Sequence, residues 1–212
     1  PENISLSYLP IGNRIKLRLT GAGDELNDVN TALDEQILKL KPLIQHKTIS
    51  WNGGEIQEIL GEILTERKLK ISVAESCTGG ELQRLLTSVP GSSAYFEGGV
   101  VAYTEAQKVK MLHVNPALIE SHTVVSAEVA AAMSLGCQML FNTDISVATT
   151  GVAGPSSDEY GTPVGTVLYS IRVNETELSN RLFLPHLDRK DFMNFVSQRV
   201  IQDLIAVMVQ NS

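Results

Sequence analysis

The pattern of hydrophobic and polar residues differs between the first 48 residues and the rest of the chain. Two early stretches, 4–9 and 14–19, alternate apolar and polar residues around a turn, which predicts a β-hairpin. Apolar residues then recur at helical spacing over 29–44, so one helix should follow the hairpin. Because two strands and one helix bury only a small core, residues 1–48 should form a partial α+β segment that leans on something else.

Helical and strand patterns alternate after a turn-rich linker at 47–54. The pattern predicts, in order, a helix from about 55, a strand at 69–74, a helix at 79–87, a strand at 97–103, helices at 105–112 and 126–141, and a strand at 144–150. Strands at 165–173 and 177–184 flank a short polar turn and should pair antiparallel, and 189–210 should form a closing amphipathic helix. This order favours a layered α/β domain with a mixed sheet and helices on both faces.

Composition narrows the class of protein. The 212 residues are 43% hydrophobic and 19% charged, as in ordinary soluble globular proteins. The net charge of −7 argues against a nucleic-acid partner, which needs a basic face. No apolar run approaches the roughly 20 residues of a membrane span, so no membrane partner is expected. Two distant cysteines make no disulfide framework and favour a reducing, cytoplasmic setting, and the missing initiator Met predicts a piece of a longer chain.

The segment Ala-Glu-Ser-Cys-Thr-Gly-Gly at 74–80 is the most informative one for function. It joins an expected buried strand to an expected helix, which is where ligands bind in open α/β sheets. Its glycines let a ligand approach the backbone, and the N–H groups of a first helical turn attract anions and oxyanions. A plain helix start capped by Ser76 or Thr78 explains the same residues, so this segment alone leaves both interpretations open.

A second signal is a strand that ends at Tyr103, with Lys108 one turn into the next helix. A serine hydroxyl is a poor nucleophile without a base, and lysine can be that base when burial lowers its pKa. Ser76 and Lys108 are therefore a possible nucleophile–base pair, with a solvated lysine as the alternative. Cys77 is either a rival nucleophile or a small packing residue.

A third strand end, at 149–155, is again small, polar and glycine-rich. Three such ends would line one crevice of the sheet, whereas a plain strand-to-loop turn is the alternative. The four histidines lack metal-ligand spacing, so neither a metal nor a cofactor is expected.

Several ordered motifs resemble the carboxy-terminal domain of the competence/damage-inducible (CinA) family. They are the segments 74–80, 91–96, 101–103 with Lys108, 151–155 and 163–167. The resemblance covers about residues 55–210 and implies a three-layer α/β/α fold with a mixed, mainly parallel sheet. The family includes nicotinamide mononucleotide (NMN) deamidases. The resemblance therefore implies hydrolysis of NMN to nicotinate mononucleotide and ammonia, a step in recycling pyridine nucleotides.

The resemblance also assigns roles to residues of this chain. A Ser–Lys pair does the chemistry in the family, so Ser76 and Lys108 take those roles, and Tyr103 matches the active-site tyrosine. Substrate-binding positions are expected at Thr78, Gly79, Gly80, Ser93, Thr150, Gly151, Ala153, Gly154 and Arg189. Among these, amides around Thr78 and Gly79 would hold the oxyanion, and either helix-start amides near Gly80 or Arg189 would hold the phosphate.

The domain organisation follows the same resemblance. Residues 1–48 look like the latter part of the KH-like middle domain of full-length CinA proteins, which makes 49–212 the amidohydrolase domain. The KH-like label implies no RNA binding in so truncated a segment. A homodimer is expected, because small α/β domains of this kind commonly pair.

Two stretches depart from the family pattern, and both could touch the nucleotide phosphate. Residues 156–162 stand where the family usually has paired glycines and a lysine, and Met193 and Asn194 stand where a second arginine would follow Arg189. A non-catalytic nucleotide-binding or regulatory module is therefore the alternative function, and ammonia release from NMN distinguishes the two.

Overall fold

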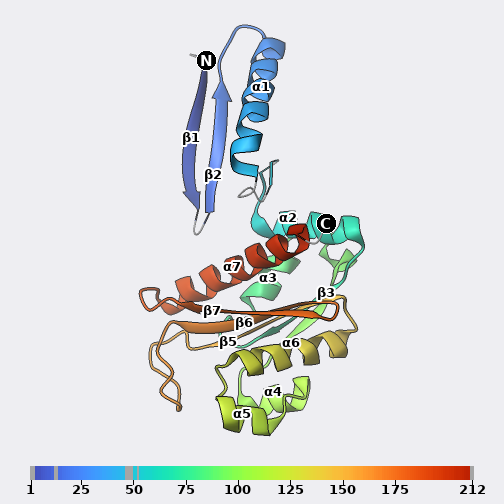
Figure 1. Ribbon diagram of the computed structural model, residues 1–212, viewed down its shortest axis with the longest axis vertical. Helices are drawn as coiled ribbons and strands as arrows, with labels where there is room; N and C mark the ends of the chain where they lie inside the picture. Colours follow the sequence, from blue (N-terminus) through green and yellow to red (C-terminus); the bar gives the residue numbers. More distant parts are fainter. Residues whose placement is uncertain (1–2, 12–13, 46–49, 52, 211–212) are drawn as a thin grey trace. The chain divides into compact units, whose positions relative to one another are not determined.

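The computed structural model describes residues 3–11, 14–45, 50–51 and 53–210 (Figure 1). The chain divides into two compact units, Pro1–Gly54 and Glu55–Ser212, so the division comes later than the residue 48 expected from the sequence. Parts of the expected turn at 10–13 and of the expected linker at 47–54 lie outside the described residues.

The first unit has the expected hairpin and helix. Strand β1 (Ile4–Ile11) pairs antiparallel with β2 (Arg14–Gly21), and helix α1 (Leu26–Ile44) follows. In α1, whose residues are all described, no side chain is buried. A hairpin and a single helix enclose too little volume to bury an apolar side chain fully.

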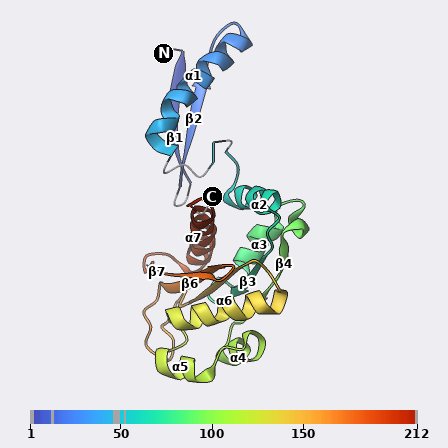
Figure 2. The ribbon, with the colours of Figure 1, turned by 45° about the vertical axis from the view of Figure 1, so that its right-hand side comes forward.

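A mixed sheet forms the middle layer of the second unit (Figures 1 and 2). Within the described residues its strand order is β4-β3-β5-β6-β7. The strands are β3 (Ile71–Glu75), β4 (Phe96–Val101), β5 (Ile145–Gly151), β6 (Thr166–Val173) and β7 (Thr176–Phe183). Strand β3 runs parallel to β4 and β5, whereas β6 runs antiparallel to β5 and β7, so the pairings divide evenly between the two kinds.

Helices cover both faces of this sheet, which confirms the three-layer α/β/α architecture (Figure 2). One face carries α6 (Ala127–Phe141), against which α4 (Glu105–Leu112) and α5 (Pro116–His122) pack. The other carries α2 (Ile56–Arg67), α3 (Glu81–Thr87) and α7 (Arg189–Gln210). Helix α5 was not expected from the sequence. No helix in the described part of the chain is long and apolar enough to cross a membrane.

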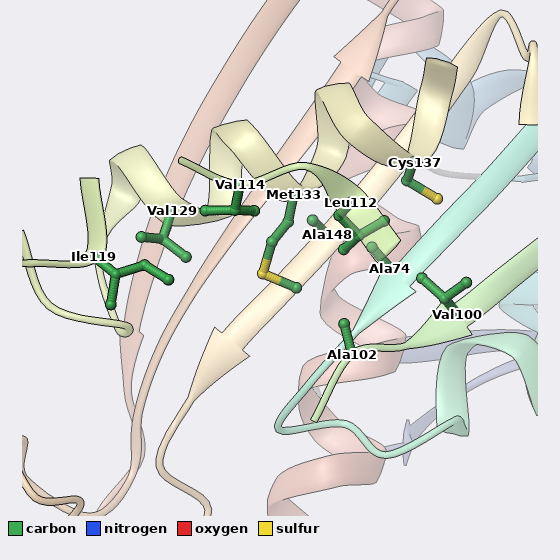
Figure 3. Close-up of a cluster of buried hydrophobic side chains, with 10 residues drawn as sticks. All are labelled: Ala74, Val100, Ala102, Leu112, Val114, Ile119, Val129, Met133, Cys137 and Ala148. Atoms are coloured by element: carbon green, nitrogen blue, oxygen red, sulfur yellow. The ribbon is translucent and has the colours of Figure 1, made fainter. Parts of the chain in front are cut away.

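The core between the sheet and α4–α6 fixes the position of α4 (Figure 3). Its buried members are Ala74, Val100, Ala102, Leu112, Val114, Ile119, Val129, Met133, Cys137 and Ala148. Helix α6 approaches α4 so closely at Gly136 that a Cβ there would lie 1.9 Å from the carbonyl oxygen of Leu112. Only glycine permits this contact, so the spacing of the two helices is set by a residue without a side chain.

The topology brings three strand ends to one edge of the sheet. Because β3 lies between β4 and β5 and runs parallel to both, their carboxyl ends meet there. Ligands bind in this crevice in open α/β sheets, so the candidate site is built at this edge.

Candidate active site

Ser76 and Lys108 form a direct, buried contact. Ser76 directly follows β3, and Lys108 lies in α4, which follows β4. Lys108 Nζ lies 3.0 Å from Ser76 Oγ and donates to the carbonyl oxygen of Ala102 at 2.9 Å. Lys108 is 1% exposed and Ser76 7% exposed. The lysine is therefore not on a solvated face, and the distance is that of a nucleophile–base pair.

Burial controls the charge of Lys108. Removal from water lowers the pKa of Lys108 from 10.5 to about 8, against weaker opposing effects of Cys77 and Glu105. Neither nearby carboxylate forms an ion pair with Lys108 in the described structure: Glu75 accepts from backbone amides, and Glu105 accepts from Tyr160. About a tenth of Lys108 is therefore neutral at pH 7 and able to accept a proton, far more than for a lysine with an ordinary pKa.

The lowered pKa of Lys108 should make the stability of the fold depend on pH, even without substrate. The unfolded chain holds a proton on Lys108 up to about pH 10.5 and the folded chain only up to about 8, so stability rises with pH between these values. Relative to Lys108→Met, the wild type should gain about 2.5 kcal/mol of unfolding free energy between pH 7 and pH 10. Urea titrations of both proteins at the two pH values measure this gain. A stability difference that does not change with pH would contradict the lowered pKa.

Cys77 is a packing residue in this structure and not a rival nucleophile. Its side chain is buried, and burial raises the pKa of the thiol to about 12. A thiol with this pKa is almost fully protonated at neutral pH, whereas the thiolate is the nucleophilic form.

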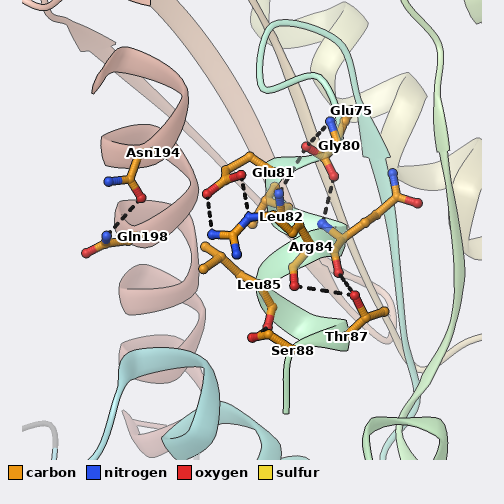
Figure 4. A network of polar contacts seen from close by, with 11 residues as sticks. Glu75, Gly80, Glu81, Leu82, Arg84, Leu85, Thr87, Ser88, Asn194 and Gln198 are labelled. Atoms are coloured by element: carbon orange, nitrogen blue, oxygen red, sulfur yellow. Dashed lines mark hydrogen bonds and ion pairs between the residues drawn. The ribbon is translucent and has the colours of Figure 1, made fainter. Parts of the chain in front are cut away.

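Glu75 holds the loop that follows the nucleophile (Figure 4). Its fully buried carboxylate accepts hydrogen bonds from the amides of Gly80 at 2.9 Å, Leu82 at 3.1 Å and Gln83 at 2.9 Å. A carboxylate at a helix start satisfies N–H groups that the helix itself leaves unpaired. The loop is thereby closed onto the end of β3, with Ser76 at its beginning.

The role of Glu75 corrects two expectations. No side chain of Ser76 or Thr78 caps α3, whose N-cap is Gly80. The helix-start amides near Gly80 are also unavailable to a substrate phosphate, because the protein's own carboxylate occupies them. The sequence placed an acidic residue directly before the nucleophile, which was the signal for this role.

The rest of the loop is tied to β5 and α7. The hydroxyls of Thr78 and Thr149 lie 2.7 Å apart, which joins the loop to β5. The Gly79 amide donates to the Ser76 carbonyl oxygen at 3.1 Å, so it is not free to hold an oxyanion. No backbone oxygen in the described part of the chain accepts a hydrogen bond from the amides of Cys77 and Thr78, so they remain candidates for that role.

Arg189 joins the ends of two strands. Its Nη1 donates to the Gly154 carbonyl oxygen at 2.8 Å, and its Nη2 donates to the Tyr103 hydroxyl at 2.6 Å. Both acceptors are uncharged, so these contacts leave the positive charge of the guanidinium uncompensated. The Tyr103 hydroxyl is thus engaged by Arg189, and no contact in the described structure joins it to Ser76 or Lys108.

The remaining expected positions divide into two sets. Thr150 and Gly151 are the last residues of β5, and Ala153 lies between β5 and Gly154. The buried Thr150 hydroxyl donates to the carbonyl oxygen of Val124 at 2.8 Å. These residues shape the edge that holds the Ser–Lys pair.

Ser93 is not brought to this edge. It lies in the short helix Ser92–Ala94, just before β4 begins. Since β4 runs parallel to β3, with Phe96 opposite Ile71, Ser93 lies at the opposite end of the sheet from Ser76. The expected binding role of Ser93 therefore has no support from its position within this chain.

The two departures from the family pattern both lie near the site. The loop 156–162 reaches α4, where the Tyr160 hydroxyl donates to Glu105 Oε1 at 2.8 Å. Met193 packs on the nucleophile loop, since a Cβ on Gly79 would lie 2.8 Å from the Met193 methyl carbon. No sequence signal pointed to the Tyr160–Glu105 contact, which joins residues far apart in the chain.

Other features of the described residues lie away from this group. A surface hollow of about 440 Å³ lies beside the turn between β6 and β7 and contains none of the residues discussed above. No three His, Cys, Asp or Glu side chains in the described structure gather closely enough to hold a metal ion.

Comparisons with known proteins agree on one family. The model of the CinA C-terminal domain matches residues 54–208. A CinA-like protein of Flavobacterium psychrophilum is 41% identical over 81% of this chain and 41% of its own length. A CinA-like protein of Chlorobaculum tepidum is 35% identical over 97% of this chain and 49% of its own length. The chain thus spans less than half the length of these two curated relatives.

Solved structures match about three quarters of the chain. The crystal structure of competence damage-inducible protein A (ComA) from Klebsiella pneumoniae matches with a TM-score of 0.70 and 28% identity, over 74% of this chain and 98% of that chain. The crystal structure of the competence/damage inducible protein CihA from Agrobacterium tumefaciens matches with a TM-score of 0.68 and 31% identity. The match covers 74% of this chain and 97% of that chain.

Proposed function

Because the chain belongs to the CinA family through its C-terminal domain, we propose that it hydrolyses the carboxamide of NMN to give nicotinate mononucleotide and ammonia. The observation that carries the proposal is the 3.0 Å contact between Ser76 Oγ and a buried Lys108 whose pKa is lowered to about 8. A serine next to a partly neutral amine is equipped to attack a carbonyl carbon.

The proposed reaction has two steps. Neutral Lys108 takes the Ser76 proton as Oγ attacks the carboxamide carbon, and the amides of Cys77 and Thr78 stabilise the oxyanion. Lys108 then gives the proton to the departing ammonia, which leaves an ester on Ser76. Lys108 then takes a proton from the water that attacks this ester and gives it to Ser76 Oγ as nicotinate mononucleotide leaves, which restores the pair.

Arg189 is the proposed phosphate-binding residue. Its guanidinium is held in place by Tyr103 and Gly154 but not neutralised by them, and arginine pairs well with phosphate oxygens. Tyr103, a residue that is 54% exposed, then acts by orienting Arg189 and by presenting its ring to the substrate.

Replacement of Arg189 should weaken phosphate binding specifically. Arg189→Gln is expected to raise the KM for NMN by roughly tenfold or more, because a hydrogen bond to a charged group is worth about 1.5–3 kcal/mol. The KM for nicotinamide riboside, which lacks the phosphate, should change little. Lys190→Gln, at the exposed neighbouring position, is the matched control. Equal losses with both substrates would place Arg189 outside the phosphate site.

Hydrolysis of NMN by the purified chain is the direct test of the proposed function. The purified chain should release ammonia and nicotinate mononucleotide from NMN in equal amounts, and the reaction should continue with EDTA present. Binding of NMN without turnover would favour a non-catalytic nucleotide-binding module instead, a possibility raised by the departures at 156–162 and at Met193.

We place the reaction in the cytoplasm, because Cys77 and Cys137 are both free thiols.

A further inference from the structure

Glu105 lies at the rim of the Ser–Lys pair. It is the first residue of α4, and Lys108 is three positions further, so the two side chains project from the same face of the helix. Lys108 is buried against Ser76, whereas Glu105 is only partly buried. Its charge reaches the pair, since it opposes the lowering of the Lys108 pKa. Glu105 therefore lies one turn closer to solvent than the base.

Tyr160 brings a second element to the same rim. The loop that carries it starts from the site residues at 151–154 and ends at β6. The turn around Tyr160 is closed by Asp158, whose Oδ1 accepts from the amides of Tyr160 at 3.1 Å and Thr162 at 2.8 Å. The Tyr160 hydroxyl then donates to Glu105 at 2.8 Å, and its side chain remains 44% exposed. A carboxylate and an exposed aromatic ring thus stand together beside the reacting pair.

The surroundings of Tyr160 are negative. The hydrogen bond to Glu105 is the largest of several influences that raise its pKa to about 12, and the charges of Glu105, Glu159 and Asp158 all act in the same direction. The departure at 156–162 has placed acidic residues where the family usually has a lysine. This rim would repel a phosphate and attract a cation.

We propose that Glu105, held by Tyr160, recognises the positive charge of the pyridinium ring of the substrate and so selects oxidised over reduced pyridine nucleotides. The inference rests on the proposed function, because it assumes that a nicotinamide carboxamide lies at Ser76. A carboxamide at that point places its ring next to the pair. The oxidised ring carries one positive charge, whereas the 1,4-dihydro ring carries none. A partly buried carboxylate attracts the former, and the exposed faces of Tyr103 and Tyr160 add cation–π attraction.

The charges of the site then match those of the substrate. Arg189 provides the positive end for the phosphate, and Glu105 the negative end for the ring. A different role for Glu105 is to stabilise α4, since acidic residues in a first turn favour a helix. That role would change the stability of the fold but would not distinguish a charged ring from a neutral one.

The test compares binding of the two ring forms to protein that cannot turn over. Calorimetry on Ser76→Ala should show NMN binding more tightly than its 1,4-dihydro form. Adding Glu105→Gln, which keeps an acceptor for Tyr160 but removes the charge, should weaken NMN binding about tenfold and change binding of the dihydro form less than twofold. Tyr160→Phe should produce a smaller loss, also confined to NMN. The matched control is Glu62→Gln, at an exposed position of α2, which should change neither affinity.

Each outcome decides the inference independently of turnover. Equal affinities for the two ring forms, equal losses for both in Glu105→Gln, or no NMN binding at all would overturn it. If the wild type binds NMN with this charge preference but releases no ammonia, the proposed function fails and the ring-recognition role of Glu105 stands.

Discussion

Replacement of Ser76 by alanine is expected to lower kcat for NMN hydrolysis by at least about 10³-fold, because the change removes the atom that attacks the carboxamide. KM should change little, since Arg189 and Glu105 are proposed to hold the substrate. Circular dichroism and the unfolding midpoint should remain close to wild type, because only a hydroxyl is lost from a loop held by Glu75 and Thr149. Ammonia release, followed at saturating NMN, measures the effect.

Cys77→Ala is the control for this loss, because it removes the neighbouring side chain and leaves the backbone amides in place. Its kcat should stay within a few-fold of wild type, since a thiol with a pKa of about 12 contributes no nucleophile. Activity retained in Ser76→Ala but lost in Cys77→Ala would exchange the two roles and would remove the Ser–Lys mechanism.

Lys108→Arg should lose about as much activity as Ser76→Ala, because a guanidinium keeps its proton and cannot act as a base. In the wild type, kcat/KM should rise with pH and level off above about 8, because only the deprotonated form of Lys108 accepts the Ser76 proton. The residual rate of Lys108→Arg should lack this rise. Rates measured from pH 6 to pH 9.5 test both statements.

Lys110→Arg, an exposed position on the same helix, controls for the introduction of arginine and should keep both the rate and the pH profile. A wild-type profile that stays flat across pH 8, or substantial activity in Lys108→Arg, would show that another group accepts the proton.

Much of the second unit could be predicted from local patterns. The boundaries of α4 and α7, and the order of the sheet-forming segments, follow from apolar periodicity, because a helix or strand must bury one face. Two strand ends suggested that Ser76 and Lys108 could meet, since parallel strands bring their carboxyl ends to one edge, but they left a solvated lysine open as well. Only the family resemblance made the pair an expectation. Helix α5 was missed although Asn115 and Pro116 are typical of a helix start.

The remainder depends on tertiary structure. Arg189 meets Tyr103 and Gly154 from three distant segments, and nothing local to any of them indicates the other two. Tyr160 and Glu105 are likewise joined only by the path of a long loop. The position of Ser93 is a different case, because a residue that precedes a parallel strand lies at the amino end of the sheet, and this could have been inferred from its place before β4.

The close approach at Gly136 bears on how natural variants of this chain should be judged. An alanine there looks conservative and lies outside the reaction centre. Its methyl carbon would nevertheless lie 1.9 Å from the Leu112 carbonyl oxygen, so α4 would have to shift by more than about 1 Å to restore an ordinary contact. Lys108 would move with its helix, away from a hydroxyl that it now contacts at 3.0 Å. A Gly136→Ala allele should therefore be scored as loss of function despite an intact catalytic motif.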